Sequence, residues 1–143
     1  MSSEIYRDKI LESYRHPKNY GSIDDAQIKV KESNPLCGDD MEMHLKLDSN
    51  NKVSDIKFTG RGCAISIASA SMLTELVKGR SLEELRSMDK QELLQKLGID
   101  SLQLNPVRIK CALLSLKTLK VGVVSHLGQQ LFAEEINVLE NEE

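Results

Sequence analysis

The chain has 143 residues, of which 40% are hydrophobic, enough to form the core of one domain but too few for two well-packed ones. It contains three tyrosines, two phenylalanines and no tryptophan, so an aromatic surface that stacks bases of single-stranded nucleic acid is not expected. The formal net charge of −3 excludes the strongly basic balance of a DNA-binding domain.

Negative charge is concentrated at the C-terminal end. Residues 134–143 contain five acids and no base, which leaves 17 acids against 19 bases in the rest of the chain. We therefore expect one domain over residues 1–128 and an acidic tail over residues 129–143, which forms a short amphipathic helix or is disordered. The sequence shows neither a signal peptide nor an apolar stretch of bilayer length, so it predicts a soluble, cytoplasmic protein without membrane contact.

The first half of the chain predicts a helix followed by three strands. Tyr6, Ile10 and Tyr14 recur every four residues, which is typical of a helix over residues 4–15. Apolar and polar residues alternate over residues 26–31 and 41–47, and residues 53–59 continue the strand pattern. Because the links between these segments are short, the strands are expected to form an antiparallel meander.

After Gly60 the pattern becomes helical. A helix rich in small residues is expected over residues 64–78, and a longer, largely buried helix should begin at Pro106 after the cap Asn105 and end near Leu127. Two short helices lie between them, and their signals are two capping boxes and a final glycine: Ser81 with Glu84, Asp89 with Glu92, and Gly98. Strands first and helices after predict an α+β fold, with a three-stranded antiparallel sheet.

The three cysteines carry most of the functional signal. Their number is odd and they are far apart in sequence, which does not fit the disulfide framework of a secreted domain. In a reducing compartment such cysteines bind metal, react as nucleophiles, or pack in the core as small apolar side chains.

Cys37 lies in the segment Asn34-Pro35-Leu36-Cys37-Gly38-Asp39. The flanking proline and glycine predict a loop between strands, and the flexible Gly38 would let the Cys37 thiolate and the Asp39 carboxylate point at one ion. The alternative is an ordinary loop in which Asp39 is solvated.

Cys63 lies in Gly60-Arg61-Gly62-Cys63-Ala64-Ile65-Ser66, between a strand and a helix. The segment is neither a dinucleotide-binding fingerprint nor a Walker loop, because the third glycine and the lysine are missing. Its glycines place Cys63 at the start of a helix, where the helix dipole favours a thiolate.

Cys111 lies in the second turn of the last helix, where a buried core thiol is the simplest interpretation. Two of the three cysteines, however, occupy glycine-containing loops at the ends of elements, where binding sites are usually built. Three thiolates and one carboxylate would suit zinc or a small iron–sulfur cluster.

These segments resemble the IscU/SufU/NifU-N-terminal family of iron–sulfur cluster assembly scaffold proteins. The resemblance rests on three motifs that occur in order, with a fourth at the end of the first helix, and it extends over roughly residues 4–127: Asn34–Asp39, Gly60–Ser66, Arg108–Ala112 and Tyr14–Asn19. It implies an α+β fold with helices packed on one face of the sheet. It also implies that Cys37, Asp39, Cys63 and Cys111 are the ligands.

The function implied by the resemblance is that of a scaffold. Sulfur would arrive as a persulfide on Cys37, Cys63 or Cys111 from a cysteine desulfurase, and a transient [2Fe–2S] cluster would pass to recipient apoproteins or carriers, with a chaperone as a further partner. In this family the Asp39 position is linked to cluster release. Such a protein is a carrier rather than a catalyst.

The chain departs from the IscU pattern at one point and from the SufU pattern at another, which keeps other functions open. Lys110 stands where IscU proteins have a histidine, and SufU proteins also have a lysine at this position. The 47 residues between Cys63 and Cys111, however, resemble the IscU spacing. The alternatives are a SufU-like, zinc-dependent sulfurtransferase that uses the same four residues, and a module in which zinc only stabilises the fold. A cysteine hydrolase is least favoured, because no histidine has an evident tie to a cysteine.

Overall fold

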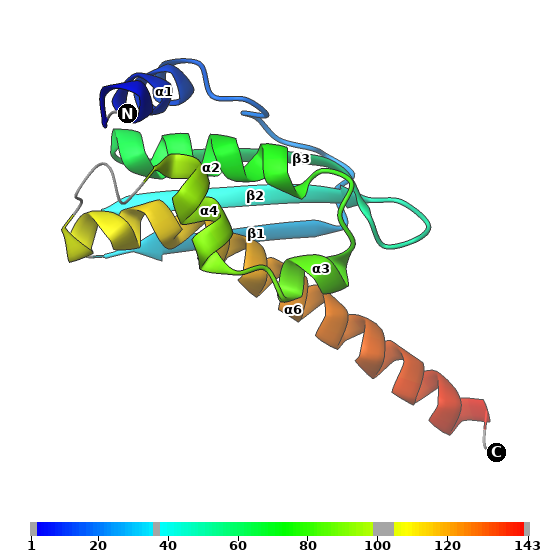
Figure 1. Cartoon of the computed structure of the whole chain (residues 1–143). Coiled ribbons are helices and arrows are strands. Elements are labelled where there is room, and N and C mark those ends of the chain that lie inside the picture. The colour runs from blue at the N-terminus through cyan, green and yellow to red at the C-terminus, as the bar shows by residue number, and fades with distance from the viewer. Residues whose placement is uncertain (1–2, 36–37, 99–104, 142–143) are drawn as a thin grey trace.

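The computed structural model describes residues 3–35, 38–98 and 105–141 (Figure 1). Three strands, β1 (Ile28–Asn34), β2 (Asp39–Leu47) and β3 (Val53–Arg61), form an antiparallel sheet in the order β1-β2-β3. Pairing runs from Ile28 opposite Leu45 to Asn34 opposite Asp39, and from Asp40 opposite Arg61 to Leu47 opposite Val53. The predicted antiparallel meander is therefore confirmed.

One face of the sheet forms the core. Alternate residues of β2 are buried, whereas the residues between them are half-exposed on the opposite face. The helices α2 (Ala64–Val77) and α6 (Pro106–Asn141) pack on the buried face, and α1 (Ser3–Arg15) packs on α2 (Figure 1). The α+β architecture with helices on one side is as expected. Among the described residues, no helix is both long and apolar enough to cross a bilayer.

The two short helices begin at the residues that the sequence indicates, and the second also ends as expected. Helix α3 (Leu82–Arg86) begins with a complete capping box between Ser81 and Glu84. Helix α4 (Lys90–Leu97) is capped by Asp89, whose carboxylate accepts from the N–H of Gln91, and it ends at Gly98 in the left-handed conformation. The second capping box does not close, because Glu92 instead pairs with Arg80 at 2.9 Å.

Helix α2 is buried along most of its length, because neighbours cover it on several sides. Its small side chains allow close approach, and three of its hydroxyl groups bond to two neighbouring parts of the chain. Ser69 donates to the carbonyl of Ala112 in α6 at 2.6 Å. Ser71 accepts from the backbone N–H of Lys18, and Thr74 accepts from the Asn19 side chain, both at 2.9 Å. These bonds fix the position of α2 and hence of its first residues.

The end of the last helix differs from the sequence prediction. Helix α6 does not end near Leu127 but continues through Gly128 to Asn141, so the expected short separate helix or disordered tail is wrong. A single interior glycine costs a helix only about 1 kcal/mol relative to alanine, and the residues beyond it favour helix. The division into a domain over residues 1–128 and a tail over residues 129–143 stays a prediction.

Deleting residues 129–143 should leave the fold and metal binding intact. Leu131 and Phe132 are 63% and 64% exposed, and Gln130 accepts a 3.3 Å hydrogen bond from the Asn51 side chain at the turn between β2 and β3. Losing such a bond costs about 1 kcal/mol. Thermal unfolding and zinc binding of the shortened chain would test this. Loss of the folded state or of the metal would show that the tail packs into the body.

Candidate metal site

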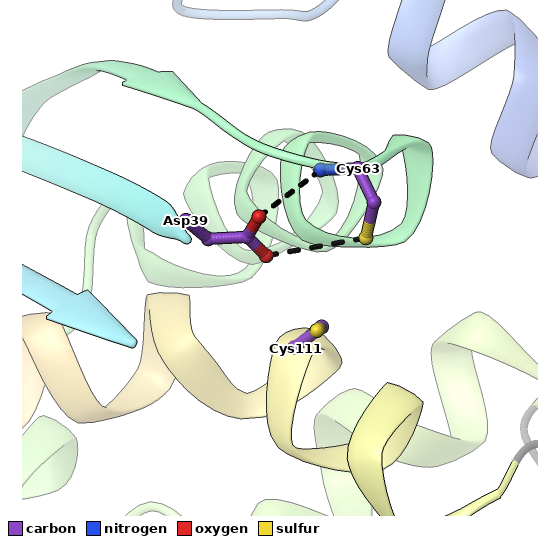
Figure 2. Close-up of side chains that lie close together, drawn as sticks. All are labelled: Asp39, Cys63 and Cys111. Atoms are coloured by element: carbon purple, nitrogen blue, oxygen red, sulfur yellow. Dashed lines mark hydrogen bonds between the residues drawn. The ribbon is translucent and has the colours of Figure 1, made fainter. Parts of the chain in front are cut away.

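Three potential ligands from three elements meet at one end of the sheet. Figure 2 shows the Asp39 carboxylate pointing towards Cys63, with Cys111 on the neighbouring helix. Their ligand atoms, one carboxylate oxygen and two sulfurs, all lie within 4.8 Å of one another. Cys37, the remaining predicted ligand, lies outside the described residues.

The sheet register explains why Asp39 and Cys63 meet. Asn34 pairs with Asp39 and Asp40 pairs with Arg61, so the start of β2 and the end of β3 lie at the same end of the sheet. Cys63 follows two residues later as the N-cap of α2, with extended backbone angles. Between them Gly62 leaves room for the carboxylate, because a Cβ at this position would lie 2.8 Å from Cγ of Asp39.

Asp39 does not lie on a solvated loop, which was the alternative left open by the sequence. It is the first residue of β2 and its side chain is only 2% exposed, directly after Gly38 with φ of +70°. A buried carboxylate needs donors to offset its loss of hydration. The backbone N–H of Cys63 donates to Oδ1 of Asp39 at 3.3 Å, and the Ser66 hydroxyl donates to Oδ2.

Opposing effects act on the pKa of the Cys63 thiol. Burial raises its pKa and is the largest single effect, but the Ser66 hydroxyl and the backbone N–H groups of Ser66 and Ile65 together outweigh it. The pKa of Cys63 is therefore lower than usual, although the charge of Asp39 acts in the opposite direction. This agrees with the expectation that the start of a helix favours a thiolate.

Cys111 is fully buried in the second turn of α6. Its location agrees with the sequence interpretation as a core thiol. The same residue is also one of the three potential ligands. Two hydroxyls of α2 face this turn: the Ser66 hydroxyl lies 3.3 Å from the carbonyl oxygen of Cys111, and Ser69 donates to the carbonyl of Ala112. The spacing between Cys63 and Cys111 thus follows from packing of α2 against α6.

Ser66 is the functional residue that the sequence reasoning did not single out. Its hydroxyl is within hydrogen-bond reach of the Asp39 carboxylate, of Sγ of Cys63 at 3.6 Å and of the Cys111 carbonyl. A hydroxyl has one proton, so it can donate to only one of these acceptors at a time. Its place one turn after a helix-capping cysteine is the signal in the sequence that could have identified it.

The donor set suits a thiophilic metal ion. Two sulfurs and a carboxylate oxygen are ligands of zinc and of iron–sulfur clusters. A spacing of up to 4.8 Å is slightly wider than the roughly 3.5 to 4 Å between donors that share one ion with bonds of about 2.0–2.3 Å, so a small side-chain movement suffices. None of the three histidines belongs to the group, and His44 lies on the open sheet face, paired with Glu42 at 3.0 Å.

Replacing Ser66 with alanine should raise the pKa of Cys63, because the hydroxyl is the strongest influence that lowers it. In the metal-free protein, the pH midpoint for alkylation of Cys63, followed by peptide mass spectrometry, should move to higher pH. Ser69→Ala is the matched control, since Ser69 is equally buried but bonds to Ala112 instead. An unchanged midpoint in Ser66→Ala would contradict the assigned role of the hydroxyl.

Comparison with known proteins places this site in a family. Residues 5–133 match the family model described as the NifU-like N terminal domain. The chain is 41% identical to the zinc-dependent sulfurtransferase SufU of Bacillus subtilis, over 87% of this chain and 92% of that protein. It is 34% identical to the iron–sulfur cluster assembly scaffold protein IscU of Haemophilus influenzae, over 87% and 98% respectively.

Solved structures agree with the sequence comparison. A structure from Fervidobacterium islandicum AW-1, described as an iron–sulfur cluster assembly scaffold protein for the SUF system, superposes with a TM-score of 0.68. It is 28% identical, and the match covers 86% of this chain and 99% of that one. Fold, motifs and relatives agree: the chain belongs to the NifU-like N-terminal domain family, together with the IscU and SufU proteins.

Proposed function

We propose that this protein is an iron–sulfur cluster assembly scaffold that uses Cys37, Asp39, Cys63 and Cys111 as ligands. The observation that supports this most strongly is the group of Asp39, Cys63 and Cys111, in which two thiols and one carboxylate meet at the ends of three elements. Cys37 is two residues from Asp39 along the chain, so we include it as the fourth ligand. The cluster is the cargo of the protein.

The proposed sulfur step is an exchange between a persulfide and a thiolate. A cysteine desulfurase presents a persulfide, and a scaffold thiolate attacks its terminal sulfur. The enzyme's S–S bond breaks and its cysteine leaves as a thiolate, while a new S–S bond forms on the scaffold. Cys63 suits this attack because its pKa is lowered and it is only partly buried, whereas Cys111 is fully buried.

Release of the cargo is assigned to Asp39. An oxygen donor holds iron less tightly than a thiolate does. The structure also offers the carboxylate other partners, the Cys63 N–H and the Ser66 hydroxyl, that satisfy it when it does not bind metal. We infer that these bonds lower the cost of detaching Asp39, so that exchange with a recipient begins at this ligand.

The direct test is assembly followed by transfer. The purified chain, a cysteine desulfurase, cysteine, ferrous iron and a dithiol that reduces persulfide sulfur to sulfide should yield a protein with the visible absorption of a [2Fe–2S] cluster, and an apo-ferredoxin should then become loaded. Omitting the desulfurase should slow assembly, and a chaperone should at most accelerate transfer. Failure of the chain to form or pass on a cluster would exclude the scaffold function. The proposed setting is the cytoplasm.

A second candidate is the zinc-dependent sulfurtransferase activity for which the Bacillus subtilis relative is named. Two observations favour it: the 41% identity to that protein, against 34% to IscU, and Lys110 before the last cysteine. In this case zinc would stabilise the ligand thiolates. One cysteine would accept sulfur in the exchange described above, and the protein would act as an enzyme.

Replacing Cys63 or Cys111 with serine should weaken zinc binding by at least about 100-fold. Loss of an outer-shell partner alone costs about 10–100-fold, and these residues are assigned as direct ligands. Cys37→Ser should behave alike, and competition with a chromogenic chelator measures the affinity. Ser71→Ala, which alters α2 on a side bonded to Lys18, is the control for indirect effects. Unchanged affinity in two of the three cysteine variants would refute the shared site.

Asp39→Ala separates the two candidate functions. If Asp39 is where cluster release begins, the variant should lose a reconstituted cluster to a chelator several-fold more slowly than the parent. If the working metal is zinc in a closed four-ligand site, losing one ligand should accelerate metal loss instead. Both proteins are reconstituted anaerobically under identical conditions. Faster cluster loss in the variant would contradict the release role and favour the sulfurtransferase.

A further inference from the structure

The second half of α6 carries an apolar surface that the other described residues leave exposed. Figure 1 shows this half running beyond the sheet towards the C-terminus. At about 100° per residue, five exposed apolar side chains fall on one arc of about 140° of the helix surface. These are Val121, Val124, Leu131, Phe132 and Ile136, which are 39% to 64% exposed. Ser125 and Glu135 also lie on this arc, so the exposed surface is mainly but not wholly apolar, and such a surface is typical of an interface.

Gly128 lies in the middle of this arc, and a single chain gives no reason for it. A Cβ at this position would meet no atom within 4 Å, so any side chain would fit. At Gly122, by contrast, a Cβ would lie 2.8 Å from Cγ1 of Val30, so packing against β1 requires glycine. An interior glycine weakens a helix by about 0.5–1 kcal/mol relative to alanine. A missing side chain in an apolar arc allows a second helix to approach closely.

The charges along α6 indicate the orientation of such a partner. Lys117 and Lys120 precede the arc's centre, whereas Glu134 and Glu135 follow it. In an antiparallel pair of α6 helices that cross at Gly128, the bases of each copy lie near the acids of the other. In a parallel pair the acids would face one another, which is unfavourable.

A crossing at Gly128 also brings one apolar pair of the arc together. Positions equally far before and after residue 128 face each other across the crossing. This places Val124 opposite Phe132 of the partner subunit. Lys120 lies opposite Ile136 of the partner subunit, a residue that is within one turn of the acids. The contact is isologous, as in most homodimers, so each pair occurs twice.

We propose that the protein forms a two-fold dimer through antiparallel pairing of α6 about Gly128. The crossing point lies 17 residues beyond Cys111, or about 25 Å along the helix at 1.5 Å per residue. The proposal does not depend on whether the protein is a scaffold or a sulfurtransferase.

Sedimentation velocity of the full chain over a concentration series tests the proposal. The parent should dissociate reversibly from dimer to monomer. Gly128→Leu should raise the dissociation constant at least tenfold, because the new side chain fits the isolated chain but blocks the close crossing. Phe132→Glu should do the same. Circular dichroism and zinc binding should stay at parental values in both variants.

The matched control is Ala133→Leu, which adds the same side chain to an exposed position outside the arc and should leave the dimer unchanged. Orientation is tested by charge exchange: Lys120→Glu and Glu135→Lys should each weaken the dimer, and the double variant should restore it. A parent that stays monomeric up to its solubility limit would overturn the proposal. So would a dimer that survives both Gly128→Leu and Phe132→Glu.

Discussion

The structure depends on how α2 satisfies its hydroxyl groups while it is buried. A buried hydroxyl without a partner costs about 1–3 kcal/mol, so each serine and threonine of α2 restricts where its neighbours can lie. Ser69 fixes the distance to α6, while Ser71 and Thr74 fix the segment that follows α1. The helix therefore has little freedom to slide or rotate. Bonds further along the helix thus hold its N-cap, Cys63, and the residue after it in place.

The ligand group follows from this constraint. Cys63 precedes α2, Cys111 is on the α6 turn that Ser66 and Ser69 face, and Asp39 is at the end of the sheet where β3 leads into α2. These three positions bring their ligand atoms within 4.8 Å of one another. Ser66 connects all three, but its single proton serves one acceptor at a time, so a change at one ligand alters the hydrogen bonding available to the others. This coupling suits a site that must both hold and release its cargo.

Much of this arrangement could be predicted from the sequence. The strand periodicity, the small-residue helix and the long helix after Asn105 and Pro106 correspond to observed elements, because each has a strong local signal. Asp39 was expected on a loop, because sequence patterns do not show that β2 pairs out to the residue opposite Asn34. The end of α6 was misplaced, because glycine is a common stop signal but weakens an otherwise favourable helix only slightly. The role of Ser66 depends on the packing of α2 against α6, which no local pattern reveals.

The central claim is that these cysteines and Asp39 form one metal site that carries the function. Its most direct test is the metal and sulfide content of the protein purified without oxygen, compared with a variant in which Cys37, Cys63 and Cys111 are all serine. The parent should contain equal amounts of iron and acid-labile sulfide and show the absorption of a cluster. If the protein is a sulfurtransferase, the parent should contain zinc instead. The variant should contain none of these. Equal metal in both proteins, or no metal in either, would contradict the claim.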